Sequence, residues 1–247
     1  MAAAVSMPLI LAIEQSSAVH EAALLRGTCA VARQSWRAES VRSQRMFAVV
    51  PLLCAQAGVS LAEVDLFAVG TGPGSFSGVR ASIATARAMA LPGGRPVVGV
   101  GSAEALAARL SREHFPARRI VVFGDARRQR VWIGEYEVAT DGTLQGDPEP
   151  RLAPVSELVP LFVPGTVAAS PDRVRLQTAL DGLGRSAVSA VLPDPAYPDA
   201  VTVGVLAAGR FAPGAPPPAP IYLHPPVFVQ PSHAVPSVEP GRQELTP

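Results

Sequence analysis

Runs of apolar residues divide the first part of the chain into strands and helices in a regular order. Residues 8–13 form a continuous apolar run that predicts a buried strand. Residues 19–25 and 28–36 predict two further strands, joined by a tight hairpin at Arg26-Gly27. Because short turns join antiparallel neighbours, three meandering strands before the first helix favour a mixed sheet.

The first predicted helix, over residues 43–58, lacks an ordinary polar face. Between residues 46 and 55 the only polar group is the Cys54 thiol. A helix that is apolar all round is either a central core helix or is covered by a partner, and the pattern leaves both open. Burying six such side chains contributes roughly 9–18 kcal/mol of gross stabilising free energy. This is comparable with the free-energy cost of protein association, which is about 4–15 kcal/mol. Pro51 lies inside this helix and predicts a kink near Val50.

A strand, a glycine loop and a second helix follow. Residues 65–70 predict a buried strand, and a helix rich in small residues begins at Val79. The loop between them holds the candidate phosphate-binding residues Gly72, Gly74, Ser75, Phe76, Ser77 and Gly78. A loop of this kind at a helix N-terminus points backbone N–H groups toward an anion. However, the loop lacks the lysine of the Walker pattern, and its glycine spacing differs from the G-x-G-x-x-G pattern of dinucleotide-binding loops. A plain tight turn is therefore the alternative.

The remaining chain predicts a second, smaller lobe. Strands are expected at residues 119–124 and 131–138, with short elements at residues 158–163, 174–183 and 201–210 and a last edge strand at residues 221–223. Arginines cluster between residues 118 and 130, where they either contact phosphate or line a solvated hairpin edge. We therefore expect an N-terminal lobe over residues 1–110, a smaller α/β lobe over 111–228 and a proline-rich, disordered tail over 229–247.

Composition narrows the possible functions. With 21 basic and 20 acidic residues the net charge is +1, so no overall field attracts nucleic acid or an acidic membrane. The chain has no lysine, which removes Schiff-base chemistry and the P-loop lysine. Cys29 and Cys54 are isolated and are expected to be buried, reduced thiols of a cytoplasmic protein. The histidines have no metal-ligand spacing, and neither a membrane span nor a signal peptide is expected.

Three segments together resemble the TsaB (YeaZ) family. They are residues 10–13 with the polar turn that follows, the loop Gly72-Pro73-Gly74-Ser75-Phe76-Ser77-Gly78-Val79-Arg80, and Asp125-Ala126-Arg127-Arg128. The resemblance implies an α/β fold of the actin-like ATPase (RNase H-like) superfamily, with a mixed sheet, flanking helices and a reduced second lobe. It also implies a non-catalytic subunit in threonylcarbamoylation of the tRNA adenosine next to the anticodon.

The resemblance also implies partners. A TsaD-type catalytic paralogue would dock on the first two helices, a TsaE-type ATPase would complete the assembly, and the chain would form a homodimer when alone. It would have no cofactor of its own, ATP or ADP and Mg would belong to the partner subunits, and tRNA would be contacted only indirectly. The resemblance implies that the following residues form the partner interface: Arg42, Arg45, Met46, Val49, Val50, Leu53, Arg80, Ile83 and Arg87.

This sequence departs from the family pattern at the first turn. Glu14-Gln15-Ser16 replaces the family's usual Asp-Thr-Ser, and the paralogue's metal-binding H-x-x-x-H is missing. With no base beside a nucleophile, the sequence argues against independent catalysis. Two other hypotheses stay in view. One is an ATP-dependent, kinase-like enzyme that uses the glycine loop, and the other is a direct RNA binder that uses the arginines between residues 118 and 130.

Overall fold

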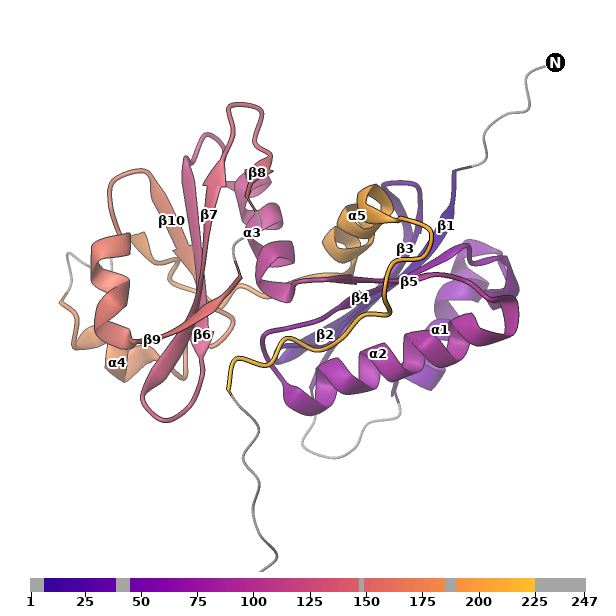
Figure 1. Ribbon diagram of the computed structural model, residues 1–247, viewed down its shortest axis with the longest axis horizontal. Coiled ribbons are helices and arrows are strands. Elements are labelled where there is room, and N and C mark those ends of the chain that lie inside the picture. Colours follow the sequence, from indigo (N-terminus) through magenta and orange to yellow (C-terminus); the bar gives the residue numbers. More distant parts are fainter. Residues whose placement is uncertain (1–6, 39–44, 147–148, 185–189, 225–247) are drawn as a thin grey trace, which may run out of the picture.

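The computed structural model describes residues 7–38, 45–146, 149–184 and 190–224, and these form two lobes, each built on one sheet (Figure 1). The first sheet has the strand order β3-β2-β1-β4-β5. Its strands are β1 Leu9–Glu14, β2 Val19–Arg26, β3 Cys29–Arg37, β4 Leu66–Gly70 and β5 Val97–Val100. β1 pairs antiparallel with β2 and parallel with β4, which confirms the predicted mixed sheet.

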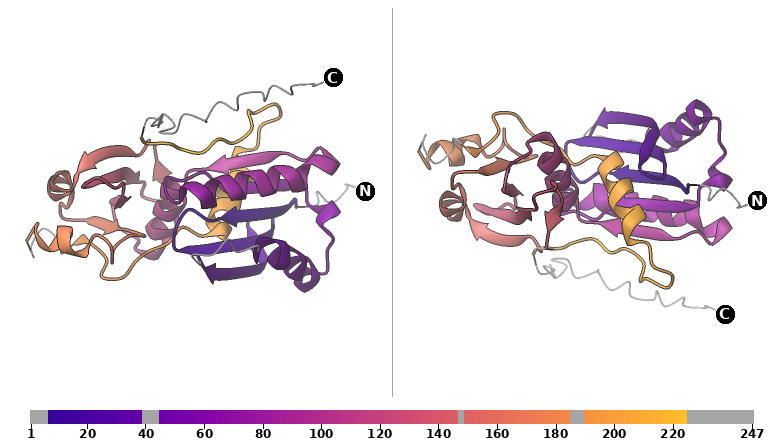
Figure 2. Two further views of the ribbon diagram at one scale, coloured as in Figure 1. Left: turned by 90° about the horizontal axis from the view of Figure 1, so that it is seen from below. Right: turned by 90° about the horizontal axis from the view of Figure 1, so that it is seen from above.

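Helices cover both faces of the first sheet. α1 (Arg45–Ala57) and α2 (Phe76–Ala90) lie on one face, and α5 (Ala200–Arg210) crosses the other (Figure 2). Side chains alternate along β1, so Leu11 packs toward α1 and α2 whereas Ile10 packs toward α5. The sequence pattern predicts residues 201–210 in the second lobe, and this prediction is wrong. They complete the first lobe, because α5 packs on the first sheet.

The second lobe is built on β6 and β7, the two strands that the sequence predicted. Its strands are β6 Arg119–Asp125, β7 Arg130–Val138, β8 Leu144–Gln145, β9 Arg151–Pro154 and β10 Thr166–Ala169. α3 (Ser102–Glu113) packs against this sheet and also against α5, so it joins the lobes, while the short α4 (Gln177–Asp181) lies on the far side (Figure 1). Short 3-10 turns span Leu61–Glu63, Leu91–Gly93 and Val155–Leu161. Two lobes, a mixed first sheet and helices on both of its faces confirm the predicted α/β architecture.

Residues 211–224 form an extended segment without regular structure, here called the C-terminal strap. The predicted edge strand at residues 221–223 is therefore wrong. Instead, the Ile221 N–H donates to the Thr71 carbonyl at 2.9 Å, and the His224 Nε2 lies 2.7 Å from the Ala126 carbonyl. The strap thus ties the glycine loop of the first lobe to the β6–β7 turn of the second. The predicted tail over 229–247 lies outside the described residues.

The two cysteines lie in different environments. Cys54 is buried as predicted, but Cys29 is exposed at the start of the edge strand β3, so its expected burial is wrong. In the part of the chain that the structure describes, no helix is both long and apolar enough to cross a membrane.

Candidate functional site

The glycine loop docks tightly on the turn that follows β1. A Cβ atom added at Gly74 would overlap the Ser16 carbonyl, and one at Gly78 would overlap the Gln15 carbonyl. The Ser75 N–H donates to the Ser16 carbonyl at 2.7 Å. Glycine is therefore required here because backbone meets backbone, and this contact fixes the N-terminus of α2 against the sheet.

Several polar groups of this loop form hydrogen bonds within the chain. The Ser75 hydroxyl caps α2 by accepting from the Gly78 N–H at 3.2 Å, and the Gly72 N–H donates to the Ser102 hydroxyl at 3.0 Å. The Ser82 hydroxyl donates to Gln15 Oε1 at 2.9 Å, which joins α2 to the turn. These particular groups are therefore already engaged within the chain, and whether the loop binds an anion stays a prediction.

Glu14, the last residue of β1, turns its carboxylate inward. It is fully buried and accepts from the Ser16 N–H at 2.6 Å and from the Ser102 hydroxyl at 2.8 Å. The α-carbon of Gly70 faces this carboxylate so closely that a Cβ there would overlap it. Glu14 therefore serves as an internal brace between the β1 turn, β4 and α3, and its oxygens do not face solvent.

Stability should depend on the ionisation of Glu14. Burial raises the pKa of this carboxyl above its ordinary value near 4.5, against the hydrogen bonds from Ser16 and Ser102, which lower it. The folded chain then holds the proton more tightly than the unfolded chain. Stability should be greatest below the unfolded pKa and should fall as pH rises through the folded one. We expect Glu14→Gln to remove this decline in urea unfolding measured from pH 4 to pH 8.

Glu63 provides a control of opposite sign for that experiment. Its carboxylate accepts from the Ser60 N–H at 2.7 Å and the Ser60 hydroxyl at 2.9 Å in a capping box, which lowers its pKa. Glu63→Gln should therefore remove a loss of stability on acidification and leave the decline at higher pH in place. An unchanged pH profile in Glu14→Gln would contradict the brace.

The first two helices place most of the sequence-predicted interface inside the chain. Arg45, Arg80 and Arg87 are exposed, and Arg42 lies outside the described residues. The apolar members are buried in the core beneath α1 and α2: Met46, Val49, Val50, Leu53 and Ile83. Their assignment to a partner surface is corrected, because the sheet of the same chain already covers them.

The opposite side of α1 is apolar too, and it faces solvent. Phe47 is 67% exposed and Leu52 is 45% exposed, and Ala48, Pro51 and Ala55 beside them are also exposed. We call these five residues the α1 outer face. On α2 the stripe of Ser82, Ala86 and Ala90 is buried and lets that helix approach its own sheet. Sequence periodicity could not choose between the two sides of α1, because both are apolar.

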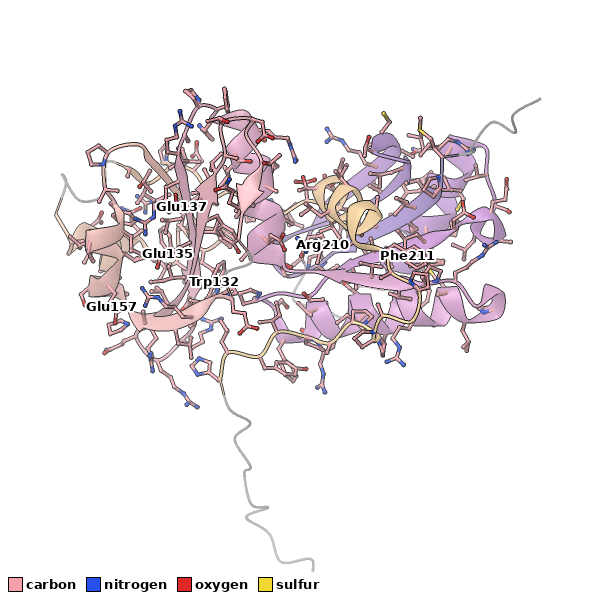
Figure 3. All side chains as sticks on the ribbon, turned by 45° about the horizontal axis from the view of Figure 1, so that its top comes forward. Trp132, Glu135, Glu137, Glu157, Arg210 and Phe211 are labelled. Atoms are coloured by element: carbon pink, nitrogen blue, oxygen red, sulfur yellow. The ribbon has the colours of Figure 1, made fainter. Side chains whose placement is uncertain are left out.

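The arginine cluster divides between two environments. Arg119 pairs with Glu135, which also accepts from Arg151, and Arg151 pairs with Glu157 at 2.6 Å. Figure 3 shows Glu135 and Glu157 on the second lobe, where these ion pairs occupy their carboxylates. The β6–β7 turn instead exposes Arg127 and Arg128. Asp125, at the base of this turn, pairs with Arg127 at 3.1 Å and with Arg175 at 3.7 Å.

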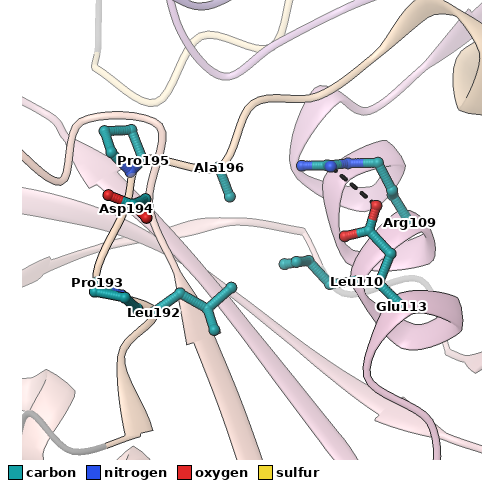
Figure 4. A pocket seen from close by; sticks show the side chains of 8 residues that line it. All are labelled: Arg109, Leu110, Glu113, Leu192, Pro193, Asp194, Pro195 and Ala196. Carbon is teal, nitrogen blue, oxygen red and sulfur yellow. Dashed lines mark hydrogen bonds and ion pairs between the residues drawn. The ribbon is translucent and has the colours of Figure 1, made fainter.

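Two hollows between described residues lie away from the glycine loop. One, of about 230 Å³, lies between α3 and residues 192–196 and contains the Arg109–Glu113 ion pair at 3.0 Å (Figure 4). A neighbouring hollow of about 560 Å³ mixes arginines with Glu21, Glu113 and Asp199. Opposite charges balance in the larger hollow, whereas the smaller one sets Glu113 and Asp194 against Arg109, so neither is lined as an anion site. Across the described residues, no group of three or more His, Cys, Asp and Glu side chains is arranged to hold a metal ion.

Comparison with known proteins gives a consistent set of relatives. Residues 37–189 match the TsaD family, described as tRNA N6-adenosine threonylcarbamoyltransferase. The chain is 33% identical over 105 residues to the tRNA threonylcarbamoyladenosine biosynthesis protein TsaB of Escherichia coli, an alignment covering 42% of this chain and 45% of that protein. It is 32% identical over 128 residues to Bacillus subtilis TsaB, covering 52% and 55% of the two chains.

A solved structure extends the likeness over most of the chain. YeaZ from Pseudomonas aeruginosa superposes with a TM-score of 0.68 and 28% identity, covering 82% of this chain and 91% of that one. By sequence alone, the chain spans about half the length of the curated relatives it matches. The similarity in fold therefore reaches further along the chain than the similarity in sequence.

Proposed function

This chain is a TsaB (YeaZ) member of the TsaD family, and from that premise we propose that it acts in tRNA threonylcarbamoyladenosine biosynthesis as a non-catalytic subunit. In this proposal it activates a TsaD-type catalytic partner by docking on it. A TsaE-type ATPase completes the assembly in the cytoplasm, ATP or ADP and Mg belong to those partners, and the free chain forms homodimers.

The α1 outer face carries the proposal. Its inner side is covered by the first sheet, yet Phe47 and Leu52 remain in solvent with three small or rigid apolar residues around them. A contiguous exposed apolar patch on a folded domain is typical of a protein–protein interface. Arg80 and Arg87 on the solvent side of α2 would supply a polar rim. The proposed surface thus keeps the two helices named from the sequence and changes which of their residues make contact.

The engaged polar groups of the first turn and the glycine loop support the non-catalytic part of the proposal. The Glu14 carboxylate is enclosed and hydrogen-bonded, and the loop N–H groups of Gly72, Ser75 and Gly78 bond within the chain. Nothing in the geometry of the described residues favours the kinase-like alternative. ATP turnover by the purified chain alone, abolished by a substitution at Gly74, would revive that alternative.

Nucleoside analysis of tRNA tests the proposed function. In cells lacking this gene, the threonylcarbamoyl mark on tRNA should be lost, and the wild-type gene should restore it. A gene carrying Phe47→Asp and Leu52→Asp should not restore it, although its product accumulates normally. Full modification of tRNA in the deletion strain would overturn the proposal.

A further inference from the structure

We propose that the junction of the two lobes carries a binding surface for single-stranded RNA, made of Phe76, Arg80, Arg127, Arg128 and Tyr222. We call it the aromatic–arginine surface. The inference rests on the proposed function only in the choice of RNA, since a tRNA would then be the natural ligand. It departs from the expectation that tRNA is contacted only indirectly.

The aromatic half consists of two rings left in solvent. Phe76, the first residue of α2, is 60% exposed, and Tyr222 of the strap is 52% exposed. Their ring centroids lie 5.5 Å apart with an interplanar angle of 35°, and the Arg80 guanidinium lies 4.6 Å from the Phe76 centroid. Exposed aromatic rings and planar guanidinium groups are the platforms on which single-strand binders stack bases.

The basic half is the β6–β7 turn. Arg127, Arg128 and Gln129 have consecutive left-handed φ values of 66°, 53° and 60°, a conformation that costs free energy in any residue with a Cβ atom. Backbone kept in such conformations is concentrated at functional sites. This turn exposes both arginine side chains, and Arg128 makes no hydrogen bond or ion pair with any residue that the structure describes.

The C-terminal strap brings the two halves together. Tyr222 stacks near Phe76, and two positions later His224 bonds to the carbonyl of Ala126, the residue before Arg127. Extended backbone places Cα atoms two residues apart at most about 7 Å from each other. The end of the strap thus lies between the start of α2 and the β6–β7 turn (Figure 1). A single strand can therefore place a base on the rings and a phosphate on the arginines.

This arrangement is local, which agrees with the near-neutral chain. The Asp125 carboxylate at the base of the turn is already paired with Arg127 and Arg175, so it adds little repulsion toward a phosphate. With three arginines at the surface, the slope of log affinity against log salt concentration should be about −2 for a single strand. Binding should therefore weaken moderately with salt and show little dependence on sequence.

Fluorescence anisotropy with the full chain tests the surface. The probes are a tRNA anticodon stem-loop, an unrelated single-stranded RNA of the same length and the corresponding duplex. We expect both probes with unpaired bases to bind and the duplex to bind more weakly. Phe76→Ala and Tyr222→Ala should each weaken binding about tenfold, and Arg128→Ala should reduce the magnitude of the salt slope by about 0.7.

Matched controls separate this surface from others. Phe115→Ala removes an exposed ring of the second lobe and Arg95→Ala an exposed arginine beyond the far end of α2, so both should bind RNA like the wild type. No RNA binding by the wild type, or equal binding by Tyr222→Ala and Phe115→Ala, would overturn the proposal. So would variants that lose a TsaD-type partner but keep RNA, because the surface would then be a protein contact. Loss of the tRNA mark in the deletion strain is independent of these outcomes.

Discussion

Phe47→Asp combined with Leu52→Asp is expected to abolish binding of a TsaD-type partner while the chain stays folded. Both side chains lie on the α1 outer face and are exposed, Phe47 more than Leu52, so aspartate costs the folded monomer far less than it would in the core. In a complex the same carboxylates would be buried in an apolar interface without a partner charge, which is strongly unfavourable. We expect affinity to fall at least about 100-fold, or about 3 kcal/mol.

Titration calorimetry with a purified TsaD-type protein measures this loss of affinity, and two further variants serve as controls. Val174→Asp changes a side chain that is also exposed and apolar but lies in the second lobe, and it should bind normally. Leu53→Asp places a charge in the core beneath α1 and should unfold the chain. Wild-type affinity in the Phe47 and Leu52 double variant would show that the α1 outer face does not dock the partner.

Gly78→Ala is expected to destabilise the chain by about 3 kcal/mol, a large effect for one methyl group. Gly78 lies within α2, where alanine would normally favour the helix. Its new Cβ atom would, however, overlap the Gln15 carbonyl, which is backbone and cannot rotate away. Relief requires the N-terminus of α2 to move off the turn, which would break the contact between the Ser75 N–H and the Ser16 carbonyl.

Urea unfolding followed by circular dichroism measures this loss. Gly209→Ala is the matched control, because Gly209 also lies in a helix and a Cβ there meets nothing within 4 Å. That control should leave stability within about 1 kcal/mol of the wild type or raise it. Equal stabilities of the two variants would contradict the role assigned to the glycine loop.

The order of elements through β7 could be predicted from the sequence because each strand and helix has its own local pattern. The continuous apolar run of β1 and the hairpin at Arg26-Gly27 both carry local signals. The orientation of α1 could not be predicted, since Phe47 and Val50 are equally apolar and only the sheet determines which one is buried. The resemblance named α1 and α2 as the docking helices, which stays a prediction, and tertiary structure was needed to choose the side of α1.

Long-range packing accounts for the other differences. Nothing local in residues 200–210 indicates that α5 returns to the first sheet, where the side chain of Leu25 packs closely against Gly204. Likewise Tyr222 was expected in an edge strand, and only the three-dimensional structure places it beside Phe76, far away in the sequence. The glycine loop gave the clearest motif, yet its docking on Gln15 and Ser16 depends on a segment that the motif does not contain.

The late position of α5 has a consequence for synthesis on the ribosome. One side of the first sheet, including Ile10, Ala12 and Leu25, is covered by a helix that emerges only after the entire second lobe. Until α5 has been synthesised, this apolar surface is exposed to chaperones or to other nascent chains. A chain truncated before residue 200 would keep both sheets but leave one face of the first sheet uncovered, which would promote aggregation and degradation.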